Sequence, residues 1–254
     1  MATIAENIQT LRSIKSDLKN AITNKGGSVG NDFKTYAQAI TNLPSGGGGG
    51  TENEDALIQR TISGTYYNDR VSMVASYVFS GCSALQSIDF PNCTIVKGYA
   101  FNNCLSLINV NLPNCSYVGG GAFNHCSNLS NFNLQNCIHI EDNAFYACSG
   151  LISVDLPNCT YMTGAIFYAC KSLTTVRLPI CTSIMGGGTF ANCTNLTQIY
   201  LNSVTKVTNL ENTNYFRNCP NLTSIYVPAS LVDAFKVAKY WSSISDKIVA
   251  YTGT

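Results

Sequence analysis

Charged residues are scarce in this sequence, and their scarcity excludes one class of partner. Lysine, arginine, aspartate and glutamate make up 11% of the 254 residues, less than half of the roughly 25% found in ordinary domains. The formal net charge is +1. A protein that binds nucleic acid normally presents a basic face, and this sequence offers none. We therefore predict that the protein does not bind nucleic acid.

Long apolar runs are also missing. No run approaches the roughly 20 residues that cross a bilayer, so we predict no membrane insertion. Residues 1–24 are polar and amphipathic, without the uninterrupted apolar stretch of a signal peptide. Taken as written, the chain is expected to be made and left in a cytoplasm.

The residue patterns that catalysis and metal binding need are scarce as well. The sequence has two histidines, His125 and His139, and lacks a Cys-x-x-Cys pair, whereas zinc sites need clustered ligands at close spacing. It shows no repeated carboxylate pair, nucleophile motif or phosphate-binding loop. We predict that the protein is not an enzyme and holds no metal or other cofactor.

Cysteine, by contrast, is abundant, and its spacing reveals an internal repeat. From Cys82 to Cys181 successive cysteines lie 11 residues apart, and their surroundings alternate, so the true period is 22. Each repeat reads Phe-x-x-Cys-x-x-Leu-x-x-Val-x-Leu-x-x-Cys-x-x-Val, as in Phe101–Val118. Seven coils are countable, and small insertions interrupt the series near residues 186–188 and 209–214.

The repeat predicts the fold class. Leucine and valine at spacings of three and two place a short strand in each coil, for example Leu107–Leu112. Stacked coils align these strands about 4.8 Å apart. We expect an α/β-type repeat solenoid, a right-handed coil with one parallel sheet. It should be mostly strand and loop, with a small amino-terminal helical module and a carboxy-terminal helical cap.

The cysteines are expected to be buried free thiols that act as small apolar residues. Stacked columns bring neighbouring cysteines within bridging distance but point their side chains the same way, which suits the disulfide dihedral poorly. One column holds an odd number, seven, and Val204 takes the place of a cysteine in one coil. Disulfides and metal binding are the alternatives.

Two motifs carry a resemblance to a known family. The stretch Leu85–Val96 fits the leucine-rich-repeat consensus, and an Ala-Phe-x-x-Cys segment is added at Ala100–Cys104 and again at Ala144–Cys148. In these motifs the sequence resembles the BspA-like subfamily of leucine-rich-repeat proteins over about residues 56–250. The resemblance implies a capped solenoid.

Five segments are expected along the chain. They are a docking or oligomerisation module at 1–43, a glycine-rich linker at 44–55, an amino-terminal cap at 56–78, seven coils at 79–228 and a carboxy-terminal cap at 229–254. In the last segment Ser230 and Asp233 predict a capping-box start of a helix, and Trp241 is the expected anchor. The helix face should hold Leu231, Ala234, Phe235 and Ala238.

Residues 1–43 differ in kind from the repeats. Their apolar residues follow a heptad seam and a second short helix: Ile4, Ile8, Leu11, Leu18, Ile22, Phe33, Tyr36 and Ile40. Two short helices rarely fold alone, so we predict docking into a larger assembly and homo-oligomerisation, with a trimer as the expected state. A self-contained hairpin is the alternative. This segment resembles leader modules of bacteriophage structural proteins, which implies a virion assembled in the host cytoplasm.

A column of solvent-facing residues on the predicted strands is the candidate binding surface. Its members are Asp89, Asn111, Asn133, Asp155, Arg177, Tyr200 and Tyr226. Concave solenoid sheets commonly bind partners, so we expect this column to contact a host-surface glycan or protein. The alternative is a solubilising ladder of mutually bonded amides, in which Asp155 and Arg177 pair across adjacent strands. A second outward line, Ile95, Tyr117, His139 and Tyr161, is interpreted as a subunit contact or surface filling.

Together these features predict a non-enzymatic fibre or appendage protein of a bacteriophage virion that presents a solenoid for host recognition. The first alternative is a BspA-like adhesin of a bacterial cell surface without its signal peptide. The second is the non-catalytic binding domain of an enzyme.

Overall fold

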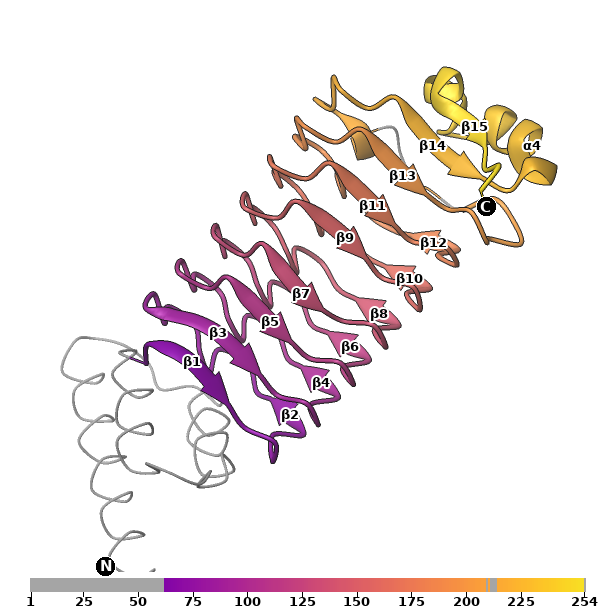
Figure 1. The fold of residues 1–254 in the computed structure, drawn as a ribbon. Helices are drawn as coiled ribbons and strands as arrows, with labels where there is room; N and C mark the ends of the chain where they lie inside the picture. The colour runs from indigo at the N-terminus through magenta and orange to yellow at the C-terminus, as the bar shows by residue number, and fades with distance from the viewer. Residues whose placement is uncertain (1–61, 209, 211–213, 254) are drawn as a thin grey trace, which may run out of the picture. The chain divides into compact units, whose positions relative to one another are not determined.

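Two rows of short parallel strands run along this computed structural model (Figure 1). The structure describes residues 62–208, 210 and 214–253. The chain divides into two compact units, Met1–Leu43 and Pro44–Thr254, and all described residues belong to the second. The predictions for the docking module, including its eight apolar residues, and for the glycine-rich linker lie outside the described residues.

The first row contains the strands that the repeat predicted. Its members are β1 (Gly64–Tyr67), β3 (Leu85–Asp89), β5 (Asn109–Asn111), β7 (Asn131–Asn133), β9 (Ser153–Asp155), β11 (Thr175–Arg177), β13 (Gln198–Tyr200), β14 (Ser224–Val227) and β15 (Ile248–Ala250). Paired strands are parallel, and from β3 onward residues one coil apart are in register. The predicted repeat solenoid with a parallel sheet is confirmed.

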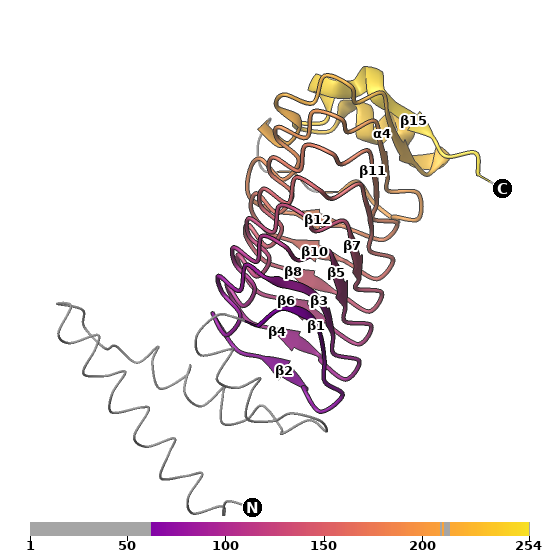
Figure 2. The same cartoon turned by 60° about the vertical axis from the view of Figure 1, so that its left-hand side comes forward.

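A second row of two-residue strands lies in the other half of each coil, which the sequence had not indicated as strand. It consists of β2 (Met73–Val74), β4 (Ile95–Val96), β6 (Tyr117–Val118), β8 (His139–Ile140), β10 (Tyr161–Met162) and β12 (Ser183–Ile184). Figure 2 shows the two rows on different sides of the stacked coils. The core therefore lies between two walls of backbone hydrogen bonds.

A column of stacked phenylalanines fills one side of this core. Neighbouring ring centroids are 4.9 to 5.8 Å apart and their planes differ by 2 to 14°. The members are Phe79, Phe101, Phe123, Phe145, Phe167, Phe190 and Phe216, and the first six are at most 1% exposed. Offset stacking of this kind adds to the apolar burial of each ring.

All twelve cysteines are free and buried, and most donate a hydrogen bond to the backbone. In the first column each thiol from Cys104 onward donates to a phenylalanine carbonyl of the preceding coil, as Cys148 Sγ does to the carbonyl oxygen of Phe123 at 3.1 Å. In the second column the acceptor lies two residues further along the chain, as for Cys115 Sγ and the carbonyl oxygen of Tyr117 at 3.2 Å. The thiols thus satisfy carbonyl groups that face an apolar core.

This burial predicts unreactive thiols. Burial is the main cause that raises the pKa of Cys115 and of Cys137 to about 12, and the thiolate is the reactive species. We expect an aromatic disulfide reagent at pH 8 to modify the folded protein slowly and all twelve thiols quickly in guanidinium, followed by absorbance. A rapid phase of one or more thiols in the folded protein would contradict this assignment.

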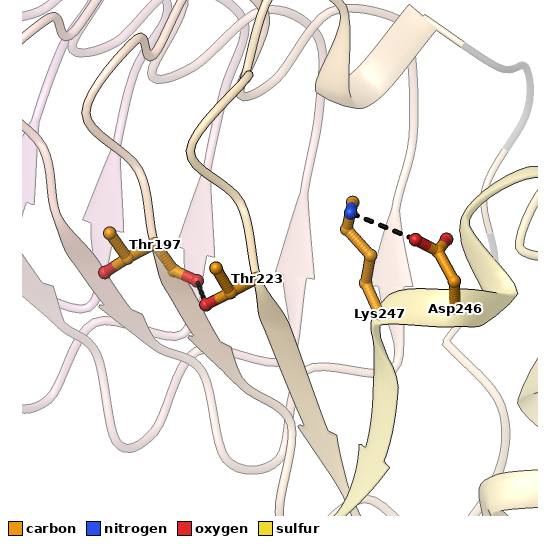
Figure 3. A network of polar contacts seen from close by, with 4 residues as sticks. All are labelled: Thr197, Thr223, Asp246 and Lys247. Carbon is orange, nitrogen blue, oxygen red and sulfur yellow. Dashed lines mark hydrogen bonds and ion pairs between the residues drawn. The ribbon is translucent and has the colours of Figure 1, made fainter.

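Polar side chains hold neighbouring coils together at the corners. Asn114 Nδ2 donates to the carbonyl oxygen of Pro91 at 2.8 Å, and Asn136 Nδ2 to that of Pro113 at 2.9 Å. Thr223 Oγ1 donates to the carbonyl oxygen of Thr197 at 3.0 Å (Figure 3). Uncharged donors therefore satisfy the turn carbonyls, which is consistent with the low charge of the chain.

Two turn positions in the coil take a left-handed backbone conformation. Before the first cysteine of each coil they are Gly81, Asn103, His125, Ala147, Ala169, Asn192 and Asn218. Two residues before the core phenylalanine they are Tyr77, Tyr99, Gly121, Asn143 and Gly188. Glycine adopts this conformation freely and asparagine at modest cost, whereas for other residues it costs about 1–2 kcal/mol. Tyr77 and Tyr99 therefore carry more strain than Gly121 and Asn143, which take the same position in the next two coils.

The carboxy-terminal cap differs from the predicted helix. The helix α4 covers Val232–Val237 only, after a 3-10 turn, η2 (Ala229–Leu231), and Leu231 caps it without a side-chain bond. The predicted capping box is wrong, because Ser230 lies inside that turn. Ala238 is extended and ends the helix. Of the predicted apolar face only Phe235 is buried, and Ala234 is exposed.

Trp241 is the anchor of this cap, as predicted. It is 1% exposed, packs edge to face on Phe235 with centroids 5.0 Å apart, and donates from Nε1 to the carbonyl oxygen of Thr208 at 2.7 Å. The chain then passes through the 3-10 segment η3 (Ser242–Lys247) into β15, which pairs with β14. Tyr215, in the 3-10 turn η1 (Asn214–Phe216), donates to the carbonyl oxygen of Ile184 at 2.9 Å and covers the end of the second row.

Candidate binding surface on the first row of strands

The predicted column falls into two groups of residues. Asp89, Asn111 and Asn133 lie in register on β3, β5 and β7. A second in-register group lies on β9, β11, β13 and β14: Asp155, Arg177, Tyr200 and Tyr226. The two groups are separate because the first row divides into a four-stranded sheet that ends at β7 and a five-stranded sheet that begins at β9. We call the outward surface of both groups the first-row face.

The first group is a ladder of mutually bonded side chains. Asn111 Nδ2 donates to Asp89 Oδ1 at 2.7 Å, and Asn133 Nδ2 donates to Asn111 Oδ1 at 2.9 Å. In the neighbouring column Asn131 Nδ2 donates to Asn109 Oδ1 at 3.2 Å. This is the arrangement of the solubilising alternative. These amides already use one another as partners, and they have correspondingly less capacity to bind a ligand.

The ladder ends in an unsatisfied acceptor at the division between the sheets. Asn133 Oδ1 is buried and has no hydrogen-bond partner among the described residues. The equivalent residue of the next coil, Asp155, ends in a carboxylate that only accepts. Phe132 adds bulk there, because it replaces the valine found at 110 and 154 and packs against Phe145 with centroids 5.1 Å apart. The division between β7 and β9 thus coincides with an unsatisfied acceptor, a neighbour that can only accept, and a larger core side chain.

Asp155→Asn is expected to stabilise the protein. The new amide would donate to Asn133 Oδ1, and satisfying a buried acceptor contributes about 1 kcal/mol. Urea unfolding of the two proteins measures the difference. Asp155→Ala is the matched control, because it removes the charge without supplying a donor. Equal stabilisation by both variants would assign the effect to charge and contradict the proposed hydrogen bond.

The predicted pair of Asp155 and Arg177 is not formed. The two residues are register partners on β9 and β11, but within the described part of the chain the sole ion pair joins Asp246 and Lys247 (Figure 3). Arg177 instead places its guanidinium over the Tyr200 ring, 4.2 Å from the centroid. An exposed ion pair contributes little, whereas a planar guanidinium is attracted to an aromatic face and keeps its edge hydrated.

Three tyrosines form a cluster beside Arg177. The rings of Tyr200 and Tyr226 are stacked, with centroids 4.6 Å apart and planes 20° apart. Tyr251 meets both rings at steep angles, 82° and 79°. Gln198 accepts a hydrogen bond at Oε1 from Tyr200 Oη at 3.1 Å and donates from Nε2 to Tyr226 Oη at 3.5 Å. We call Arg177, Gln198, Tyr200, Tyr226 and Tyr251 the tyrosine cluster.

Sequence reasoning missed Tyr251. The residue directly follows β15, which adds to β14 and so brings Tyr251 beside Tyr226. The signal was present in the sequence, because Ile248, Val249 and Ala250 form a short apolar run after the cap. The helical cap expected at 229–254 leaves no place for a strand at these residues.

The second outward line also exists as a continuous column. His139 lies between Tyr117 and Tyr161 on the second row, with ring centroids 5.4 and 4.8 Å away. Burial, together with the neighbouring Glu141, raises the pKa of Tyr117 to about 12. These rings are half-buried and contact one another, which matches the surface-filling interpretation. Its role as a subunit contact stays a prediction.

The side chains of the first-row face offer amide and phenol hydrogen bonds, aromatic edges, the carboxylates of Asp89 and Asp155, and one guanidinium. Across residues 62–208, 210 and 214–253, no three or more histidine, cysteine, aspartate or glutamate side chains lie where they would hold a metal ion. Over the same ranges no helix has the length and apolar character needed to cross a bilayer.

Comparison with protein families agrees with the repeat. A family model described as a BspA type leucine rich repeat region matches residues 56–158 and 117–241, in six copies. The match covers the second row of strands, the first row up to β14, and every member of the tyrosine cluster except Tyr251. A search of curated proteins finds no match.

Several solved structures are similar to this chain. A leucine-rich repeat protein of T. pallidum is similar with a TM-score of 0.50 and 21% identity, over 66% of this chain and 86% of that one. For the pneumococcal vaccine antigen PcpA the TM-score is 0.49 and the identity 15%, over 76% of this chain and 42% of that one. For a leucine rich cell surface protein of Faecalibacterium prausnitzii the values are 0.31, 14%, 78% and 82%. At 21% identity the likeness to the T. pallidum protein shows the fold alone.

Proposed function

The chain belongs to the BspA-type leucine-rich repeat family, and from this premise we propose that it is a non-enzymatic recognition protein that binds a protein on a cell surface through its tyrosine cluster. The observation that carries the proposal is the packing of Arg177, Tyr200 and Tyr226 into one fixed stack on an exposed sheet. Tyrosine and arginine, together with tryptophan, are enriched at the energetic centres of protein interfaces.

The orientation of the rings favours a protein over a glycan. Sugars stack on a free aromatic face, but one face of Tyr200 is covered by Arg177 and the other by Tyr226. The stack therefore presents ring edges and hydroxyl groups, which suit the mixed polar and apolar surface of a protein. Because the rings are already held in place, little side-chain freedom is lost on binding.

The charges of the cluster suggest what the partner contributes. Arg177 is exposed and, among the described residues, has no carboxylate oxygen within ion-pair distance. Asp155, one coil away, is exposed as well. A partner surface with an acidic side chain opposite Arg177 and a basic one opposite Asp155 would complement both.

Labelled full-length protein incubated with a panel of bacterial and epithelial cells tests this function. We expect binding to at least one cell type, its loss after protease treatment of the cells, and a decrease of about tenfold or more in affinity for Tyr200→Ala and Tyr226→Ala, as for typical interface centres. Asn111→Ala in the amide ladder is the control and should bind normally. Binding that resists protease but disappears after periodate oxidation would identify a glycan instead.

Two cellular settings suit such a recognition protein. A BspA-like adhesin would act at a bacterial cell surface. A virion fibre would be assembled in a host cytoplasm through residues 1–43, and the resemblance of that segment to bacteriophage leader modules supports this second candidate. Both would use the tyrosine cluster in the same way.

Light scattering distinguishes the adhesin from the virion fibre, because it measures the oligomeric state of the protein. For a fibre we expect the full chain to be a homo-oligomer, with a trimer as the expected state, and a chain starting at Thr51 to be a monomer. The reason is that the heptad seam of the first 43 residues supplies the contact between copies. An unchanged mass after removal of that segment would contradict the oligomerisation role.

A further inference from the structure

Two exposed tyrosines outside the tyrosine cluster are stacked in a strained backbone. Tyr77 and Tyr99 have ring centroids 5.2 Å apart and planes 5° apart. They are 46% and 38% exposed. Both have positive φ, 63° and 57°, a conformation that is unusual for bulky side chains.

The coil does not need tyrosine at these positions. Tyr99 N donates to the carbonyl oxygen of Gly120 at 2.9 Å, and in the next coil Gly121 N makes the equivalent bond to Asp142 at 2.8 Å. Glycine at 121 and asparagine at 143 thus meet the same backbone requirement with less strain. A strained residue that the fold does not require is a reason to look for a function.

The surroundings of the pair make it a fixed platform. A Cβ atom on Gly121 would lie 2.5 Å from Cε1 of Tyr99, so the Tyr99 ring rests directly on the glycine backbone. Its other face is covered by Tyr77. Tyr77 is the end ring of the stack and the more exposed of the two. Among the described residues it has no ring contact besides Tyr99.

We propose that Tyr77, supported by Tyr99 and Gly121, is a stacking site for a neutral glycan. The face of an aromatic ring is electronegative and attracts the slightly positive C–H groups on the flat side of a pyranose. A single-stranded nucleic acid would need a positively charged groove beside the rings, whereas charged residues make up only 11% of this chain and leave a net charge of +1. This site is separate from the tyrosine cluster, where the faces of Tyr200 are covered.

Titration of the full-length protein with cellohexaose and with chitohexaose tests the site by calorimetry and by tyrosine resonances in nuclear magnetic resonance spectra. We expect one of them to bind, and the double variant Tyr77→Asn with Tyr99→Asn to bind about tenfold or more weakly. Because asparagine tolerates the left-handed backbone, the melting temperature of that variant should be unchanged or raised by about 2–4 °C.

Tyr168→Asn is the matched control. Tyr168 is stacked on Tyr146 with centroids 4.8 Å apart and planes 4° apart, but neither residue has a positive φ. This variant should keep glycan binding and lose thermal stability. Tyr226→Ala should also keep glycan binding, because Tyr226 belongs to the tyrosine cluster and not to the glycan site. The glycan proposal and the protein-recognition proposal can therefore fail independently. The inference is overturned if neither hexasaccharide binds, or if the double variant binds as well as the natural protein.

Discussion

Replacing Phe123 by alanine is expected to lower the free energy of unfolding by about 3–5 kcal/mol. The ring is 0% exposed and stacks on Phe101 and Phe145 with centroids 5.1 and 5.2 Å away. The loss combines the transfer energy of the ring with a cavity that two neighbouring coils cannot fill. Since small domains are stable by only about 5–15 kcal/mol, this change approaches the total.

Urea unfolding followed by circular dichroism measures the effect of this substitution. Phe123→Leu is the control, because it keeps most of the volume and removes the stacking; it should cost about 1–2 kcal/mol, within the range of ordinary core substitutions. A loss below 1 kcal/mol for the alanine variant would mean that the phenylalanine column does not carry the core.

The second large effect is loss of stability at alkaline pH. Burial raises the pKa of Cys115 and Cys137 from the ordinary value of 9.0 to about 12. Between these values the unfolded chain releases protons that the folded chain retains, so the unfolded state gains stability as the pH rises. Each such thiol removes about 1.4 kcal/mol of folding free energy per pH unit above pH 9. Below pH 9 the thiols are protonated in both states, so the stability that they contribute is fully present.

Several thiols titrate this way, so we expect cooperative unfolding a short distance above pH 9. Unfolding free energies at pH 8, 9 and 10 give the slope directly. The double variant Cys115→Val with Cys137→Val should have a shallower slope, by up to about 2.7 kcal/mol per pH unit, and valine is a suitable replacement because Val204 occupies a cysteine slot of a later coil and is 4% exposed. An unchanged slope would show that these thiols do not control alkaline stability.

The period of the sequence predicted the first row of strands because side-chain alternation and repeat spacing determine it jointly. Asn111, Asn133 and Tyr226 lie on the face where the pattern placed them. The second row was missed since two-residue strands are too short to show alternation. They arise from stacking between coils, which supplies hydrogen-bond partners that a single repeat lacks.

The features of the binding surface that the sequence does not predict depend on which of two neighbouring groups a side chain contacts. Arg177 had a carboxylate on one side and a ring on the other, and only the packed structure shows that it lies over Tyr200. The orientation of the Asn111 and Asn133 amides likewise depends on their neighbours, and it leaves Asn133 Oδ1 without a hydrogen-bond partner among the described residues. Both outcomes depend on competition among interactions of similar strength.

The thiol-to-carbonyl bonds of the first cysteine column and the asparagine-to-carbonyl bonds have a consequence for how the gene can change. Each joins a coil to the one before it, as Cys148 is joined to Phe123 and Asn136 to Pro113. Loss or duplication of one whole 22-residue unit by recombination therefore brings together two coils that already carry matching donors and acceptors. The rod can lengthen or shorten in single steps without a compensating mutation. Selection can then change the length of the solenoid without changing the segments that cap it.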